Sequence, residues 1–390
     1  MDYKIGFSGK AINYSVKEIE AVVNAMNAET LTQGKQLLEF EKKVSNYTGG
    51  EFCFGVNNGT SALELSAQLC QFEEGDELIL PSHTFTASAY PFLKNSAKLV
   101  WADIDIKTRV ITAETITKLI TPKTKAILVV HLYGYLADMN EIMEVAKKYN
   151  LIVIEDAAQA IGTRLNGKHA GTFGDFGIFS FHSHKNLTTL GEGGMLVVKD
   201  KKHADLIPQL RHNGHCAFSF DRKDYWKPAM GNVDLPELNG KPLLPNNFCI
   251  GEIECALGTK LLDRIDQINQ EKRLRAISFI DSLKKYDLMD FHRVDSDRHN
   301  YHLLVARVRA GKRNELMEEL VYRRKIQCVV QYYPLNRYPF YQKLGYGDAD
   351  CPNSDEFFDN MISFPFHHWM SDGDFEYVLN STRDTLKKIS

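Results

Sequence analysis

The sequence predicts an α/β protein with a large domain, built on a mostly parallel sheet flanked by helices, and a smaller C-terminal α+β domain. Two observations predict this class. Between residues 52 and 198, continuous apolar runs of strand length alternate with helical segments, which is typical of a parallel sheet covered on both faces. In addition, 390 residues are too many for one small core, so two domains are expected.

The elements of the large domain follow from hydrophobic periodicity. Apolar residues at helical spacing predict helices over 15–29, behind a serine that can cap the first turn, and over 35–47. Continuous apolar runs predict strands at 52–56, 77–81, 98–103, 126–132, 151–155, 177–181 and 195–198. Helices are predicted between them at 61–69, 85–94, 113–120 and 139–149.

The pattern changes after residue 215. Residues 216–247 form a polar stretch with Pro and Gly, and a loop of this length is usually functional or disordered. Its Tyr225 and Trp226 favour an ordered lid or interface. A helical run over 250–268 is expected to bridge into the second domain. The predicted domains are 1–250 and 251–390, the second with strands near 302–307 and 327–332 and helices near 314–322 and 374–388.

Composition and charge narrow the classes of function. A hydrophobic fraction of 44%, 25% charged residues and a net charge of −3 are ordinary for a globular protein and argue against a nucleic-acid surface. The first residues lack both the apolar run of a signal peptide and the Arg-rich pattern of a transit peptide. No apolar segment approaches the roughly 18 residues that span a bilayer. A cytoplasmic protein is therefore expected.

The cysteines and histidines indicate neither disulfides nor a metal site. The seven cysteines are scattered and form no CxxC pair, as a disulfide framework or a zinc site would require. His182 and His184 could begin a metal site, but no Cys or further His lies nearby at ligand spacing. No metal is expected.

The residues with the clearest chemical potential lie at the ends of predicted strands, where ligands bind in such sheets. Lys185 stands in a polar loop between the strands at 177–181 and 195–198, just before a glycine-rich turn. A lysine held there can be partly desolvated, which lowers its pKa and suits it to Schiff-base chemistry. Most loop lysines are simply exposed, so this interpretation depends on the neighbouring motifs.

Two other motifs supply those neighbours. Asp156 follows an apolar strand, and a partly buried carboxylate needs a partner. That partner is either an arginine or a helix N-terminus, or the protonated ring nitrogen of a pyridine cofactor. The turn at 57–60 leads from a strand into a helix, so it is either a phosphate site at a helix start or an ordinary capped connection.

Taken together, these motifs supply all the parts of a pyridoxal-phosphate site. Lys185 would bind the aldehyde, Asp156 would keep the pyridinium charged, and the turn at Gly59 would hold the phosphate. Ser180, at the end of its strand, could donate to that phosphate, and Phe85 could stack on the ring. Without the other motifs, Phe85 would be assigned to the core.

The same segments resemble the DegT/StrS sugar aminotransferases, which are fold-type I pyridoxal-phosphate enzymes. The cofactor-lysine signature of that family resembles GDFGIFSFHSHKNLTTLGEGGMLVV. Its ring-nitrogen motif, phosphate turn and ring-stacking segment resemble VIEDAAQAIG at 153–162, NNGTSAL at 57–63 and PSHTFTASA at 81–89. Further similarity at 31–41, 210–215, 245–258 and 332–341 extends the resemblance over most of the chain.

The resemblance implies a role for each matching residue. Lys185 would form the Schiff base and act as the general base of the 1,3-proton shift. Asp156 would meet the ring nitrogen, and Gln159 would lie near the 3′-oxygen of the ring. The phosphate would be held by four residues, the last contributed by the neighbouring subunit of a homodimer with two shared active sites: Thr60, Ser61, Ser180 and Asn247.

The resemblance also implies the reaction. Members of the family move an amino group, usually from glutamate, to a keto group of a nucleotide-linked sugar, for surface-polysaccharide or related amino-sugar biosynthesis. A minority are sugar dehydratases in which histidine replaces the lysine, so Lys185 favours amino transfer. A regulatory protein that keeps only the fold would have a degraded cofactor site, whereas these motifs are intact.

Two departures from the family pattern leave the acceptor open. Asn336 stands where the family often has histidine, and the stretch at 216–246 is longer than expected. Either change could reshape the acceptor pocket, even toward a small phosphorylated ketone such as dihydroxyacetone phosphate. The candidate partners of a substrate phosphate or carboxylate, each of which can also be structural or solvated, are Arg211, Arg222, Lys223, Lys227, Tyr333 and Arg337.

Overall fold

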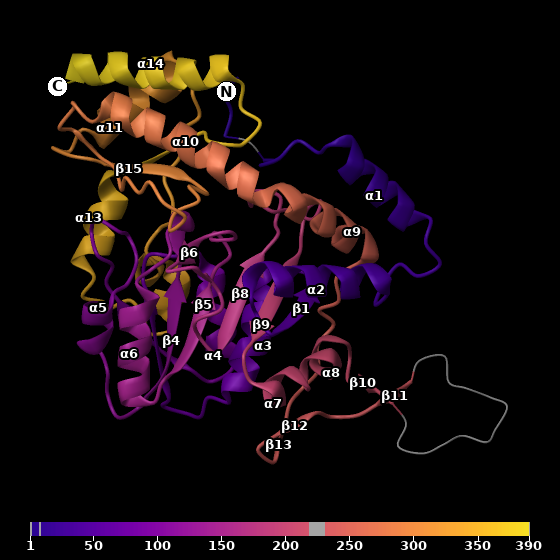
Figure 1. Ribbon diagram of the computed structural model, residues 1–390. Coiled ribbons are helices and arrows are strands. Elements are labelled where there is room, and N and C mark those ends of the chain that lie inside the picture. Colours follow the sequence, from indigo (N-terminus) through magenta and orange to yellow (C-terminus); the bar gives the residue numbers. More distant parts are fainter. Residues whose placement is uncertain (1, 8, 218–230, 390) are drawn as a thin grey trace, which may run out of the picture.

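The computed structural model describes residues 2–7, 9–217 and 231–389 (Figure 1). Part of the predicted loop lies outside them, and with it Arg222, Lys223, Tyr225, Trp226 and Lys227. The other parts of that loop carry two short antiparallel ladders, which pair β10 (His215–Cys216) with β11 (Asn232–Val233) and β12 (Glu237–Leu238) with β13 (Lys241–Pro242).

A seven-stranded sheet with the order β1-β9-β8-β5-β4-β2-β3 forms the centre of the fold. Its strands are β1 (Phe52–Val56), β2 (Glu77–Pro81), β3 (Lys98–Ala102), β4 (Thr124–Val130), β5 (Ile152–Asp156), β8 (Phe176–Ser180) and β9 (Gly194–Val198). From β8 to β3 all neighbours are parallel, whereas β9 runs antiparallel to both β1 and β8. The predicted α/β class with a mostly parallel sheet is therefore confirmed, with strand ends within two residues of those expected.

Helices surround this sheet, as the alternating sequence predicts. They are α2 (Lys35–Thr48), α3 (Gly59–Cys70), α4 (Tyr90–Lys94), α5 (Ala113–Thr117), α6 (Met139–Tyr149), α7 (Lys201–Ala204) and α8 (Ile207–Arg211). The first predicted helix is α1 (Val16–Met26), and Ser15 caps it by accepting from the Glu18 N–H. A small ladder of β6 (Arg164–Leu165) and β7 (Lys168–His169) follows β5.

A second sheet of three antiparallel strands lies in the C-terminal part, in the order β14 (Met289–Asp290), β15 (Leu304–Val308), β16 (Met361–Phe364). Its hydrophobic core is separate from that of the large sheet and includes Phe279, Leu316 and Phe364. The helices of this part are α11 (Arg313–Glu318), α12 (Pro339–Lys343), α13 (Pro352–Asn360) and α14 (Asp372–Ile389). The division of the chain at residue 250 stays a prediction.

One expected strand is wrong. Residues 327–332 are not a strand, because they pair with β16 only through a single bridge between Val329 and Ser363. The third strand is instead β16, a short apolar run that the sequence did not single out. Because the 327–332 segment leaves the sheet after this bridge, Gln331 and Tyr332 can line a cavity rather than a strand ladder.

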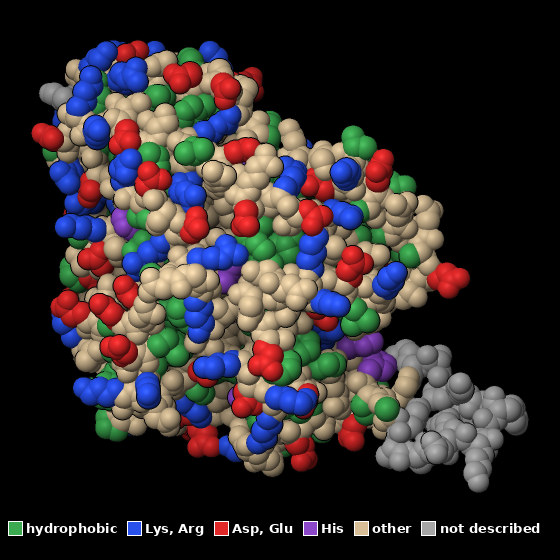
Figure 2. All heavy atoms as spheres, in the orientation of Figure 1, with side chains coloured by type: hydrophobic (Ala, Val, Ile, Leu, Met, Phe, Trp, Pro, Cys, Tyr) green, Lys and Arg blue, Asp and Glu red, His purple; other side chains and the backbone are tan. Residues whose placement is uncertain are grey.

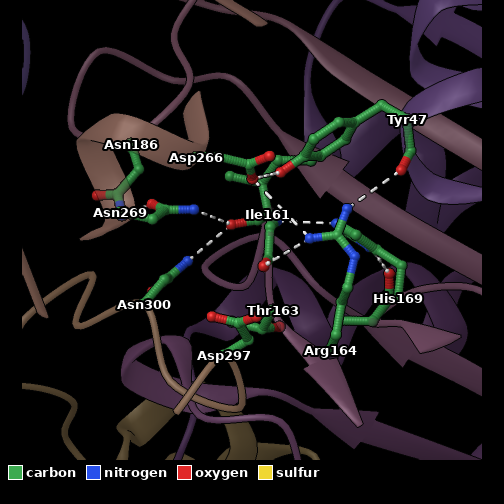
Figure 3. A network of polar contacts seen from close by, with 12 residues as sticks. Tyr47, Ile161, Thr163, Arg164, His169, Asn186, Asp266, Asn269, Asp297 and Asn300 are labelled. Atoms are coloured by element: carbon green, nitrogen blue, oxygen red, sulfur yellow. Dashed lines mark hydrogen bonds and ion pairs between the residues drawn. The ribbon is translucent and has the colours of Figure 1, made fainter. Parts of the chain in front are cut away.

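Helix α10 (Ile265–Leu283) follows α9 (Glu252–Leu261), so the bridging helical run is longer than predicted. In Figure 1, α10 runs from the region of the second sheet to α9, beside α2. Figure 3 shows how α10 is fixed: Asn269 Nδ2 and Asn300 Nδ2 both donate to the Ile161 carbonyl, at 2.9 and 3.0 Å. Asn186, one residue after Lys185, donates to Asn269 Oδ1 at 2.9 Å. The two parts of the fold therefore meet beside the lysine loop.

On the face shown in Figure 2, neither positive nor negative charge predominates, because Lys and Arg side chains are interspersed with Asp and Glu. This agrees with the small net charge. Among the helices in the described part of the chain, none is both long and apolar enough to cross a membrane.

Candidate active site

A cavity of about 500 Å³ lies where β5, β8 and the turn after β1 end. This is the edge at which ligands bind in parallel α/β sheets. Most of the predicted cofactor residues line it together: Gly59, Thr60, Phe85, Asp156, Gln159, Ser180 and Lys185. Residues from segments more than 120 positions apart in the sequence thus form one site.

Lys185 reaches this cavity from the loop after β8, and its backbone N–H donates to the His182 carbonyl at 2.8 Å. Its amine makes no hydrogen bond or ion pair with residues that the structure describes. Burial lowers the pKa of Lys185 to about 8, against the opposing charges of Asp156 and Glu192. At neutral pH a far larger fraction of this amine is therefore neutral, and nucleophilic, than of an ordinary lysine.

Asp156 ends β5, and its carboxylate is buried at the cavity wall. Oδ2 accepts from the Ser88 hydroxyl at 2.7 Å, and Oδ1 accepts from the Ala158 N–H at 3.1 Å. Within the described chain, no arginine or lysine forms an ion pair with it. A buried carboxylate whose hydrogen-bond donors are all neutral has no cation in direct contact, and a cationic ring nitrogen in the cavity would supply one.

The turn after β1 is both capped and open to a ligand. Asn58 Oδ1 accepts from the Ser61 N–H at 2.9 Å and so caps α3. None of the hydrogen bonds among described residues uses the N–H groups of Gly59 or Thr60, which lie at the positive end of the helix and line the cavity. A Cβ on Gly59 would lie 3.1 Å from Ser180 Cβ, so glycine permits this close approach of the helix to β8.

Gln159 and Phe85 form further parts of the wall. Gln159 Oε1 accepts from the Tyr133 N–H at 2.7 Å, and its Nε2 donates to the Tyr332 hydroxyl at 3.2 Å. Phe85 is 55% exposed, too much for a core aromatic, and its ring meets that of Tyr332 edge-on at 6.0 Å between centroids. Its face is therefore available for a planar ligand.

These residues fit pyridoxal phosphate. The cavity offers an amine without a hydrogen-bond partner, a carboxylate without an ion-pair contact, free N–H groups at a helix start and an exposed aromatic ring. Each matches one part of the cofactor: its aldehyde, ring nitrogen, phosphate and ring face.

Two predicted phosphate residues lie outside the cavity. The Ser61 hydroxyl donates to Asn57 Oδ1 at 2.6 Å, and Ser61 is not among the lining residues. Asn247 is exposed on the surface and is paired through a backbone bridge to His212. Asn247 therefore does not contribute to the cavity of its own chain.

The predicted substrate residues also lie elsewhere. Arg211 is buried, and its Nη1 pairs with Glu41 Oε1 at 2.5 Å, so the structure gives it a structural partner. Arg337 pairs with two carboxylates, those of Asp355 and Asp359. Tyr333 packs edge-on against Tyr338 and Phe358.

Several cavity residues were not singled out from the sequence as cofactor or substrate ligands: Phe7, Tyr90, His184, His302, Gln331 and Tyr332. Ser88, the partner of Asp156, was not predicted either. It stands three residues after Phe85 in the predicted ring-stacking segment, and that proximity was the available signal. For Tyr332 and Tyr333 the sequence offers no basis for choosing which one faces the cavity.

Comparison with known proteins agrees with this geometry. Residues 13–383 match the model of the DegT/DnrJ/EryC1/StrS aminotransferase family. The chain is 33% identical over 369 residues to dTDP-3-amino-3,6-dideoxy-alpha-D-galactopyranose transaminase of Aneurinibacillus thermoaerophilus, covering 94% of each. It is 32% identical over 386 residues to UDP-4-amino-4,6-dideoxy-N-acetyl-beta-L-altrosamine transaminase of Campylobacter jejuni, covering 97% of this chain and 96% of the relative.

A solved structure extends the similarity to the whole fold. Helicobacter pylori PseC, an aminotransferase involved in the biosynthesis of pseudoaminic acid, superposes with a TM-score of 0.88 at 26% identity, covering 98% of this chain and 99% of PseC. The fold is thus that of fold-type I aminotransferases. The chain belongs to the DegT/DnrJ/EryC1/StrS aminotransferase family and is a pyridoxal-phosphate-dependent aminotransferase.

Proposed function

We propose that this enzyme moves an amino group from L-glutamate to a keto group of a nucleotide-linked sugar, in amino-sugar biosynthesis. The observation that carries the proposal is the unpaired amine of Lys185 beside Asp156 in one cavity. The names of the two transaminases, one for a dTDP-linked and one for a UDP-linked sugar, support the acceptor class.

Each side chain in the cavity would have its own role in the reaction. Pyridoxal phosphate, when bound, supplies an electron sink for the carbon atom that loses or gains a proton. Lys185 Nζ would accept that proton and give it back. Asp156 would hold a proton on the ring nitrogen by its negative charge, and the N–H groups of Gly59 and Thr60 would bind the phosphate. Phe85 would cover one face of the ring and keep water from it.

Ser180 and Gln159 complete the proposed set of cofactor contacts. Ser180 lines the cavity beside Gly59, where its hydroxyl can donate to the phosphate. The Gln159 side chain is held by Tyr133 and Tyr332, and in this position it would lie near the 3′-oxygen of a bound ring. The helix cap formed by Ser61 and Asn58 orients the N–H groups that face the phosphate.

We also propose a homodimer in which Asn247 of the partner subunit completes each phosphate site. The exposure of Asn247 supports this, as does an apolar stripe on α1. That stripe is solvent-exposed at helical spacing and consists of Val16, Ile19, Val23 and Met26, with exposed fractions of 70%, 52%, 48% and 58%. An exposed apolar helix face of this kind is typical of an interface.

A charge in this stripe is expected to separate the subunits. Ile19→Asp should shift the protein from dimer to monomer. Both its activity and its affinity for the cofactor should fall, because the shared phosphate contact is lost. Light scattering after size exclusion measures the mass. Asn24→Asp, an exposed change on the same helix outside the stripe, should leave the dimer intact. A monomeric but fully active Ile19→Asp variant would contradict the shared site.

The function itself is tested by separating the two half-reactions. L-Glutamate should convert the visible absorption band of the purified enzyme to the near ultraviolet, and a panel of dTDP- and UDP-linked 3- and 4-keto sugars should restore it. Mass spectrometry should find a new amine on the sugar. Restoration only by dihydroxyacetone phosphate would move the acceptor to small phosphorylated ketones. A product without a new amine would instead indicate a dehydratase.

A further inference from the structure

A second, smaller cavity of about 30 Å³ adjoins the active-site cavity. The two cavities share Phe7, His184, His302 and Leu303 as lining residues. The smaller one is closed by four residues from other segments: Ala11, Lys272, Phe366 and His367. None of its lining residues is an Asp or Glu within the described part of the chain, although three are histidines and one is a lysine.

Lys272 of α10 is 3% exposed, which is rare for a lysine without a carboxylate partner. Its Nζ donates to Asn186 Oδ1 at 2.9 Å and to the His302 carbonyl at 3.0 Å. An ammonium group has three donors, so one N–H remains without an oxygen or nitrogen acceptor among the described residues, and the Phe366 ring lies 5.2 Å from Nζ. Burial lowers the pKa of Lys272 to about 7. At pH 7 the amine is therefore near the midpoint of its titration, and a bound anion would raise its pKa so that it takes up a proton from solvent.

Two imidazoles complete this group, which we call the Lys272 subsite: Lys272, His302 and His367. The Nδ1 atoms of His302 and His367 are buried and have no hydrogen-bond partner among the described residues. Burial is the largest cause that lowers the pKa of both, and the charges of Lys185 and Lys272 lower that of His302 further. Other groups whose charges act on these imidazoles are His182, His184, Arg275, His368 and Asp374.

We propose that the Lys272 subsite binds a carboxylate of the amino-acid donor. This inference rests on the proposed function, in which an amino acid enters the adjoining cavity. The subsite presents a Lys272 N–H without an oxygen or nitrogen acceptor and two unsatisfied imidazole Nδ1 atoms, which donate to an anionic oxygen when each neutral ring carries its proton on Nδ1. The cavity has room for a carboxylate but not for a nucleotide. The free N–H groups after β1 already provide for the cofactor phosphate.

Kinetics of the donor half-reaction test the proposal. Lys272→Met should raise KM for L-glutamate about 10- to 100-fold, the usual effect of removing a charged hydrogen-bond partner. His367→Leu, on another segment, should act in the same direction if Lys272→Met fails to fold. The acceptor half-reaction should keep its rate. Lys260→Met removes an exposed lysine from α9 and serves as the matched control.

Comparison of L-glutamate with L-glutamine and L-norvaline, which lack the side-chain carboxylate, shows which carboxylate of the donor is bound. If it is the side-chain group, L-glutamine and L-norvaline should react equally with wild type and Lys272→Met. If it is the α-carboxylate, Lys272→Met should raise KM for all three donors by a similar factor. An unchanged KM for every donor in both variants would overturn the proposal and leave a cavity that holds only water.

Binding of glutarate, which has no amino group, provides a readout apart from turnover. Calorimetry of the holoenzyme at pH 8 in buffers of different ionisation enthalpy should show more proton uptake by wild type than by Lys272→Met. The difference should approach about one proton per site, because the bound anion raises the pKa of Lys272. Equal uptake by both would overturn the proposal. If no amino transfer occurs but this difference is found, the proposed function fails and the carboxylate subsite stands.

Discussion

Replacing Lys185 with alanine is expected to lower the rate of amino transfer by about 10⁴-fold or more, since a positioned acid–base group alone contributes about 10²–10⁴. Lys185 is the only lysine that lines the active-site cavity in the described part of the chain, so its replacement leaves that cavity without an amine. The fold should persist, because the amine makes no hydrogen bond or ion pair with described residues. The glutamate-dependent half-reaction, followed in a stopped-flow spectrometer, measures the loss.

Matched variants separate the two roles of this lysine. Lys185→Arg keeps the positive charge but cannot form a Schiff base, so it should be as inactive as the alanine variant. Added methylamine should restore part of the rate to Lys185→Ala, where space is left for it, and none to Lys185→Arg. Activity of Lys185→Ala within tenfold of wild type would refute the assignment.

The lowered pKa of Lys185 has its own consequence for the cofactor-free protein. Its amine is protonated below a pH of about 8 and neutral above it, and only the neutral form attacks an aldehyde. The rate at which the protein takes up pyridoxal phosphate should therefore rise with pH and level off above about 8. An unshifted lysine would continue to gain rate up to a pH of about 10.

The sheet and the cavity could be predicted from the sequence because both follow from local patterns. A strand buried on both faces must be apolar along its whole length, as β2 and β9 are, and this run is visible without knowledge of its neighbours. The residues that follow such strands reach the same edge of the sheet. Strand ends alone are therefore enough to place Asp156 and Ser180 in one site.

The predictions from the sequence that were wrong or missing also have physical causes. Arg211 was predicted as a substrate ligand because its ion-pair partner is not visible in the sequence around it. That partner, Glu41, lies 170 residues away in the sequence. The segment at 327–332 has the composition of a strand, but strand formation depends on a partner along its whole length, and it has one bridge. Lys272 was not predicted because nothing in the sequence around it indicates that it is buried beside His302.

Changing Asp156 to asparagine is the second substitution expected to have a large effect, lowering the donor half-reaction about 10²–10³-fold. The amide has the size of the carboxylate and can keep the contacts with Ser88 and Ala158, so the wall of the cavity should be preserved. What is lost is the negative charge that would hold a proton on the ring nitrogen. Without that proton the ring would withdraw electrons less strongly, and the donor carbon would release its hydrogen more slowly.

A comparison with Ser88→Ala distinguishes the charge of Asp156 from its orientation. Ser88 only orients the carboxylate through one hydrogen bond of 2.7 Å, so its removal should lower the rate about tenfold. Deuterium at the Cα of glutamate should slow Asp156→Asn more than wild type, because proton removal becomes the limiting step. If Asp156→Asn and Ser88→Ala were equally active, the carboxylate would serve to shape the cavity. If they differ by the expected factor, its charge is what the reaction requires.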